Sequence, residues 1–318
     1  MPGTTMSMLI QFYQQQCSPF DKIFYKTQLA SLLLSGLFIL INSLFTHYIG
    51  VPYAKWQFFL VLPFLCGLSA ITISIQEESP YLYNIVHSYS QYWVFLIINT
   101  LLLQGIQYTP FATIDHTLVH FDQSLHFNTV NWLQWTHNND LAGLLNFFYN
   151  LIHYELFFLP GILLFFITRY RFERFLLAFA LATIFSEVIY YFFPTTAPAS
   201  MFSSPLFPPT AEQTFIKFNA VHQALTYPYP SGTGGLIAFP SLHVIVGVMF
   251  IYLCIDKRWL LSFIGTANTL LILSTILLGW HYLVDVLAAI IISIICIVVA
   301  HKWIRHADQK QTSIDTAS

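Results

Sequence analysis

Long apolar runs, separated by short polar segments, dominate the chain. A helix needs about 20 mainly apolar residues to cross the hydrocarbon core of a bilayer. Runs of about this length predict eight transmembrane helices, and therefore an all-α integral membrane protein built as a helical bundle. The predicted spans are Leu29–Thr46, Trp56–Ile75, Tyr92–Phe111, Leu141–Ile167, Phe175–Phe193, Leu236–Ile255, Trp259–Gly279 and Tyr282–His301. The first run lacks a following small-residue cleavage site, so we expect it to stay in the membrane as an anchor.

Two long segments between the runs stand out. The first, Thr109–Asp140, contains an amphipathic stretch at Ile114–Trp135, which we expect to lie at the membrane interface with Asp115 and Asp122 on its polar side. The second, Pro194–Gly235, is rich in Pro, Gly and Ser, which favour turns over helix. Long loops of this kind often form a lid or a site. The tail after Arg305 is polar, and we expect it to be loose.

Composition supports the membrane assignment. Hydrophobic residues make up 56% of the 318 residues and charged residues 8%, whereas a soluble domain carries roughly 25% charged residues. The chain therefore cannot cover a water-facing surface, which excludes a soluble enzyme and a disordered linker. The formal net charge of -2 provides no basic surplus for binding nucleic acid.

The positive charges predict an orientation. With eight spans both termini lie on one side, and that side holds ten of the lysines and arginines. Only Lys55 and Lys217 fall on the other side. Basic residues are enriched in cytoplasmic segments, so we expect both termini in the cytosol. The predicted cytosolic set is Lys22, Lys26, Arg169, Arg171, Arg174, Lys257, Arg258, Lys302, Arg305 and Lys310.

A histidine and a carboxylate stand four residues apart where the last span begins. His281 and Asp285 would share one face of a helix. The carboxylate would accept the proton of one ring nitrogen and leave the other nitrogen bare, as a nucleophilic histidine requires. The alternative is a structural pair that satisfies itself at the bilayer edge.

A second short motif, Pro240-Ser241-Leu242-His243, comes where the sixth span begins. Proline suits the first turn of a helix, and a helix N-terminus presents free N–H groups to an anion. Ser241 adds a hydroxyl and His243 can face the same anion. The alternative is a Pro-started helix with a core histidine. By the span count both motifs lie on the outer side, and together they suit phosphoryl transfer: one histidine attacks phosphorus, Asp285 holds it, and the other protonates the leaving oxygen.

These residues give the sequence a family resemblance. Pro240-Ser241-Leu242-His243 and His281-Tyr282-(x)2-Asp285-Val286 resemble the second and third motifs of the type 2 phosphatidic acid phosphatase superfamily of membrane lipid phosphatases and phosphotransferases. Together with Ile114-Asp115, Phe121-Asp122 and the stretch 193–198, they look like its inositolphosphotransferase and sphingolipid-synthase branch. The resemblance covers about residues 110–300, so we expect three N-terminal spans in 1–110, a catalytic membrane domain in 111–303 and a polar cytosolic tail in 304–318.

The resemblance implies a role for each matching position. His281 would be the nucleophile that forms a phosphohistidine, Asp285 would orient it, and His243 would act first as general acid and then as base. Ser241 and Pro240 would contact a phospholipid or lipid phosphate substrate. No metal or other cofactor is implied, and the site would face away from the cytosol.

One departure from the superfamily pattern concerns the phosphate. Its phosphatases carry a first motif with a Lys and an Arg-Pro that hold the phosphate, whereas the matching region here has no basic residue between Arg174 and Ser200. Backbone N–H groups and hydroxyls, with Lys217 or His222, would then hold the phosphate. Two explanations stay open: a head-group transferase, whose branch also tends to lack this motif, or a degenerate and slow site.

Three other functions are compatible with the sequence. A lipid phosphate phosphatase would use the same intermediate and pass the phosphoryl group to water. A transporter would use Glu155 and Glu187 as ion or proton carriers. A non-catalytic membrane protein would need none of these groups. The four histidines of the first long loop do not show a metal-ligand spacing, and Ser231–Gly235 lacks the ending of a phosphate-binding loop.

Overall fold

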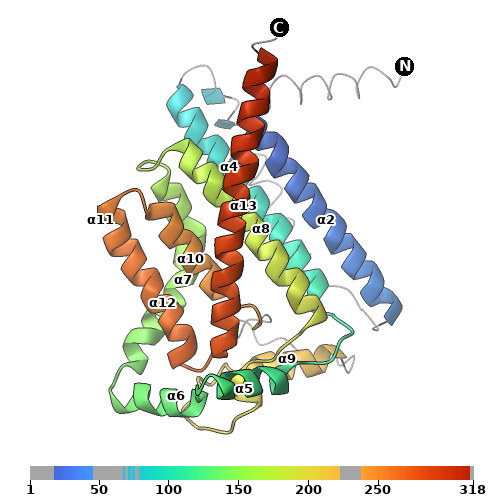
Figure 1. Ribbon diagram of the computed structural model, residues 1–318, viewed down its shortest axis with the longest axis vertical. Helices are drawn as coiled ribbons and strands as arrows, with labels where there is room; N and C mark the ends of the chain where they lie inside the picture. The colour runs from blue at the N-terminus through green and yellow to red at the C-terminus, as the bar shows by residue number, and fades with distance from the viewer. Residues whose placement is uncertain are drawn as a thin grey trace.

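The computed structural model describes residues 18–45, 67–68, 71–72, 74–75, 79–222 and 238–315. Within these ranges the chain is helical and contains no strand, and the main helices form a bundle (Figure 1). The elements are α2 (Pro19–Phe45), α4 (Pro80–Ile106), α5 (Asp115–Ser124), α6 (Thr129–Asn138), α7 (Ala142–Leu163), α8 (Arg169–Phe192), η1 (Pro198–Ser200), α9 (Gln213–His222), α10 (Leu242–Cys254), α11 (Arg258–Leu260), η2 (Leu261–Gly265), α12 (Thr266–Leu277) and α13 (Leu283–Asp315).

Most of the predicted spans fall on described helices. The exception is Trp56–Ile75, most of which lies outside the described residues. Among the described residues, four helical stretches are both long and apolar enough to cross a membrane. They support an integral membrane protein, while the count of eight spans stays a prediction. The four are Pro19–Phe45, Arg169–Phe192, Arg258–Leu277 and Leu283–Ser313; α10 is apolar but shorter.

The last helix corrects the expectation of a loose tail. α13 continues through the polar segment after Arg305 as far as Asp315. That segment contains no Gly or Pro and includes Ala, Gln and Lys, which favour helix. The change to polar residues after Arg305 therefore indicates where α13 leaves the apolar environment, and the helix itself continues beyond that point.

α8 forms the centre of the bundle. It packs against α13, α4, α10 and α2, and every side chain from Phe175 to Thr183 is buried. A helix that is apolar on all sides belongs inside a bundle. α12 packs against α7 and α10 beside this core.

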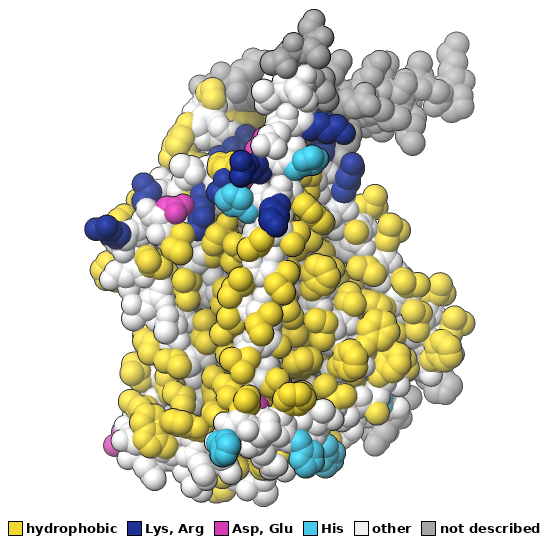
Figure 2. Space-filling model, viewed as in Figure 1, with side chains coloured by type: hydrophobic (Ala, Val, Ile, Leu, Met, Phe, Trp, Pro, Cys, Tyr) yellow, Lys and Arg dark blue, Asp and Glu magenta, His cyan; other side chains and the backbone are white. Residues whose placement is uncertain are grey.

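The two ends of the bundle differ in chemistry. On the face shown in Figure 2, lysine and arginine side chains gather near the end where α13 finishes. There Arg169 pairs with Glu173, and Arg171 lies 3.4 Å from Asp256. At the opposite end, α5 and α6 lie across the helices of the bundle, close to where α13 begins (Figure 1).

The α5–α6 region corrects a second expectation. The stretch Ile114–Trp135 is not one amphipathic segment but two helices, joined by a turn in which His126 has a φ of 57°. Asp115 and Asp122 are 2% and 3% exposed, so they face the protein and not water. The outward side carries aromatic residues such as Trp132 and Trp135, which is typical of helices at a membrane interface.

Candidate active site

The connection between α12 and α13 holds His281 in a fixed turn. Gly279 has a φ of +72°, which favours glycine, and a Cβ there would come within 2.6 Å of the Phe207 ring. The backbone N–H of His281 then donates to the carbonyl of Thr275 at 3.0 Å. The imidazole is 3% exposed. The turn therefore buries the histidine just before α13 starts.

Asp285 holds one side of the His281 ring. Nδ1 of His281 lies 3.3 Å from Oδ2 of Asp285 and 2.9 Å from the carbonyl oxygen of Ala238. Both partners accept hydrogen bonds, so Nδ1 carries the proton and Nε2 keeps its lone pair. Burial also lowers the pKa of His281 to about 3, which keeps the ring neutral. This is the protonation state that a nucleophilic imidazole needs.

The second motif begins α10, with one difference from the sequence prediction. Ser241 is the N-cap: its Oγ accepts from the N–H of Val244 at 3.4 Å. Pro240 therefore precedes the helix instead of occupying its first turn, and the Phe239–Pro240 peptide is cis. The buried Ser241 also donates its N–H to the carbonyl of Asp285 at 3.4 Å, which joins the start of α10 to the start of α13.

The two predicted histidines lie side by side. The ring centroids of His243 and His281 are 5.9 Å apart, with the planes tilted by 58°. His243 stacks on Tyr149 of α7 at 4.6 Å, and Tyr149 stacks on Trp280 at 4.7 Å. Tyr149 could not be predicted from the sequence, because one tyrosine in an apolar span does not reveal its tertiary neighbour.

Two carboxylates from α5 complete the surroundings of the motif. Asp115 accepts from the Tyr282 hydroxyl, and Asp122 accepts from the backbone N–H groups of Leu283 and Val284. Burial raises the pKa of both carboxyl groups, and the hydrogen bonds from Thr196 to Asp115 and from α13 to Asp122 oppose that shift. The sequence motif pointed to these aspartates, but their partners are remote in sequence.

The structure describes the phosphate-binding candidates only in part. The side chain of Lys217 lies outside the described residues, although its backbone belongs to α9. Nε2 of His222 lies 2.6 Å from the carbonyl oxygen of Thr109. Lys55 and Ser231–Gly235 also lie outside the described residues. The group that holds the phosphate thus stays a proposal.

The carboxylates of the spans have neighbours inside the bundle. Glu155 accepts from Nδ2 of Asn268 at 3.1 Å, which links α7 to α12. Glu187 is fully buried on α8, beside Asn99 of α4. In the described part of the chain, no group of three or more His, Cys, Asp or Glu side chains is placed to hold a metal ion.

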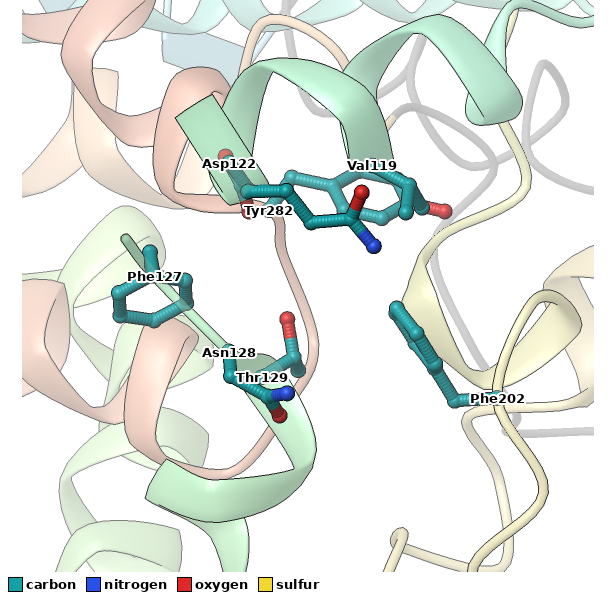
Figure 3. Close-up of a pocket in the computed structure, with 8 residues that line it drawn as sticks. Val119, Asp122, Phe127, Asn128, Thr129, Phe202 and Tyr282 are labelled. Atoms are coloured by element: carbon teal, nitrogen blue, oxygen red, sulfur yellow. The ribbon is translucent and has the colours of Figure 1, made fainter. Parts of the chain in front are cut away.

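A small hollow lies beside the motif (Figure 3). It is lined by residues of α5, the α5–α6 turn and α6, by Phe202 and by Tyr282, and Asp122 points toward Tyr282 from one wall. Its volume of about 20 Å³ holds about one water molecule. Neither histidine lines it, so it is not the place where a lipid phosphate would react.

Comparison with known proteins adds a family. A family model described as the PAP2 superfamily matches residues 116–299. The match spans more than half of the chain and contains both histidines and Asp285. Members of the superfamily are phosphatases, which supports an enzyme of the phosphatase kind acting on lipid phosphates in a membrane. No curated protein and no solved structure matches the chain. By this match and by the helical site that it covers, the chain belongs to the PAP2 superfamily.

Proposed function

We propose that the protein transfers a phospho-head group, of the inositol-phosphate type or similar, between lipids through a covalent intermediate on His281. One observation carries the proposal. The Nδ1 side of His281 is held by Asp285 and Ala238, while a second histidine ring lies 5.9 Å away. A fixed neutral imidazole beside a second imidazole supplies a nucleophile and an acid–base group.

The first step forms one bond and breaks one. Nε2 of His281 attacks the phosphorus of the donor lipid, an N–P bond forms, and the P–O bond to diacylglycerol breaks. His243 gives its proton to the leaving oxygen. The developing positive charge on His281 is stabilised by Asp285 through Nδ1–H.

The second step returns the enzyme to its starting state. The hydroxyl of an acceptor alcohol gives its proton to His243, its oxygen attacks phosphorus, and the N–P bond breaks.

Ser241 and Pro240 stand beside the first N–H groups of α10, which have no intrahelical partner and suit phosphate oxygens. Lys217 is the cationic candidate on the same side.

A lipid phosphate phosphatase is the second candidate, and the superfamily match favours it. Water would replace the alcohol in the second step. The resemblance to the transferase branch and the lack of basic residues in 175–200 favour transfer. The hydrogen bond between Glu155 and Asn268 gives that carboxylate a structural role, which disfavours the transporter alternative.

The proposed orientation places the site on the non-cytosolic face and both termini in the cytosol. Arginines gather where α8 begins, where α10 ends and along the far part of α13, and the histidines lie at the other end of α13. The positive-inside rule then assigns the basic end to the cytosol.

The experiment follows labelled phosphorus. Purified protein in lipid is incubated with phosphatidylinositol or phosphatidic acid labelled on phosphorus, with and without candidate alcohols. Label in a new lipid, lost in His281→Ala, supports the transferase; label in free phosphate, lost likewise, supports the phosphatase. Label that stays in the donor across the whole panel contradicts both. If the label stays in the donor, a transport assay follows: transport that survives His281→Ala and fails in Glu187→Gln would support the transporter.

A further inference from the structure

Two carboxylates of α5 reach the residues between His281 and Asp285. Asp115 and Asp122 are seven residues apart, about two helical turns, so they share one face of the helix. We call them the α5 carboxylate pair. Both are almost fully buried, and their partners are 81 to 167 positions away in the chain.

Asp122 caps α13 from outside that helix. Its Oδ2 accepts from the N–H of Leu283 at 2.9 Å, and its Oδ1 accepts from the N–H of Val284 at 3.0 Å. The first N–H groups of a helix have no intrahelical partner, and a carboxylate there also meets the positive end of the helix dipole. Two bonds to one carboxylate fix both the position and the rotation of the first turn of α13.

Asp115 fixes the residue next to the histidine. Its Oδ1 accepts from the Tyr282 hydroxyl at 3.0 Å, and Thr196 donates to it through both backbone N–H and hydroxyl at 3.0 Å. Tyr282 is fully buried, and its own N–H donates to Oδ2 of Asp285 at 3.0 Å. Tyr282 therefore connects Asp115 to the carboxylate that holds His281.

We propose that the α5 carboxylate pair consists of positioning residues that set the direction of His281 Nε2 toward phosphorus. The inference rests on the proposed function. His281 lies outside α13, and its ring is held through Asp285 and Ala238. Any shift of the first turn of α13 moves Asp285 and hence the imidazole. A misplacement of about 1 Å at a reacting group costs about 10²-fold in rate.

A purely structural role makes a different prediction. If the pair only stabilises the fold, its loss lowers the folded fraction and the unfolding temperature but leaves the kcat of each folded molecule unchanged. If the pair positions His281, kcat falls in protein that is folded, while KM changes little because neither carboxylate touches the substrate.

The experiment compares Asp122→Asn, Tyr282→Phe and the control Asp140→Asn. The first replaces one accepting oxygen of Asp122 with an N–H₂ group that faces a backbone N–H; the second removes the hydroxyl bonded to Asp115. Asp140 is exposed and has a φ of 54°, which asparagine tolerates. The kcat and KM for transfer from labelled phosphatidylinositol, or for hydrolysis of phosphatidic acid, are measured on monodisperse protein together with the unfolding temperature.

We expect kcat to fall by about tenfold or more in Asp122→Asn and Tyr282→Phe, KM to stay within about twofold, and the control to match the wild type. Wild-type kcat in both variants overturns the inference. If Asp122→Asn does not fold, Tyr282→Phe alone decides. His281→Ala, run in parallel, separates the two claims: turnover retained there defeats the proposed function and this inference with it, whereas turnover lost there with normal kcat in the variants defeats only the inference.

Discussion

The chemistry of the site depends on how one imidazole is buried. His281 is 3% exposed and donates through Nδ1 to two oxygens, so its remaining nitrogen is a free base. A surface histidine with an ordinary pKa would be largely protonated in mildly acidic solution and would lose this lone pair. Burial thus sets both the reactivity and the pH response of the residue.

The pH dependence of stability tests this burial. The pKa of His281 is about 3 in the folded protein, against an ordinary value of 6.5. Below pH 6.5 the unfolded chain gains a proton that the folded protein does not, so stability falls as the pH falls, by at most about 1.4 kcal/mol per pH unit. The unfolding temperature in detergent should therefore fall less steeply between pH 7 and 5 in His281→Gln than in the wild type. Parallel curves would show that the histidine is not buried as described.

The stacked partner of His243 gives a second prediction at this scale. The His243 imidazole stacks on the Tyr149 ring and lies beside His281. Tyr149→Phe keeps the stacking surface and should retain most of the activity. Tyr149→Leu removes that surface and leaves the His243 imidazole free to rotate, so kcat should fall by about tenfold. Steady-state kinetics of the two variants decide; equal activity in both would remove Tyr149 from the account.

At the scale of elements, short connections place the two histidines. The α12–α13 turn relies on Gly279, and the start of α10 is tied to Asp285 through Ser241. Hydrophobic periodicity predicts neither the turn nor the Ser241–Asp285 hydrogen bond. Each depends on one residue with a specific backbone role, Gly279 in the turn and Ser241 at the start of α10. We therefore expect a small substitution in the turn to disturb the site.

Gly279→Ala tests the turn. A Cβ at φ +72° is strained by about 1–2 kcal/mol, and it would lie 2.6 Å from the Phe207 ring. We expect the unfolding temperature to drop and kcat to fall, because the turn must open around His281. Gly143→Ala, with nothing within 4 Å of the new Cβ, is the control and should behave like the wild type; a normal kcat in Gly279→Ala would contradict the strain.

The elements also show what a sequence can reveal. The length of an apolar run and the spacing of residues within a short motif are local properties. The main helices and both histidine motifs were therefore predictable from the sequence. The buried face of α5 was not predictable from the sequence. Asp122 is buried against the first N–H groups of α13 and Asp115 against Thr196 and the Tyr282 hydroxyl, and these partners are 81 to 167 residues away in the chain. The contact of Tyr149 with His243 is likewise a tertiary contact. The helical end of α13 was not predictable from polarity, because polar residues continue a helix as readily as they end it.

At the scale of the whole molecule, the two ends of the bundle differ in the residues that they carry. Basic side chains gather at one end (Figure 2), and the histidine motifs lie at the other, where α5 and α6 cross the bundle (Figure 1). The separation fits the proposed orientation, in which the basic residues of that end face the cytosol and are too far from the histidines to hold the phosphate.

Cysteine labelling tests the orientation. In a variant without native cysteines, expressed in bacterial inner membrane, Asn139→Cys should react with an impermeant maleimide from the outer side. Gln309→Cys should react only after the membrane is permeabilised. Both positions are exposed, so accessibility on the protein is matched. The reverse labelling pattern would place the site in the cytosol.

The most direct test of the central claim is to trap the intermediate. Protein quenched during turnover of a phospholipid labelled on phosphorus is digested under alkaline conditions, and the peptide that carries the label is sequenced by mass spectrometry. The account predicts a phosphoramidate on His281 that persists in the wild type when the acceptor is withheld, is absent from His281→Ala, and forms more slowly in His243→Ala because the first step loses its acid. Label on another residue, or turnover with no covalent adduct under rapid quench, would contradict it.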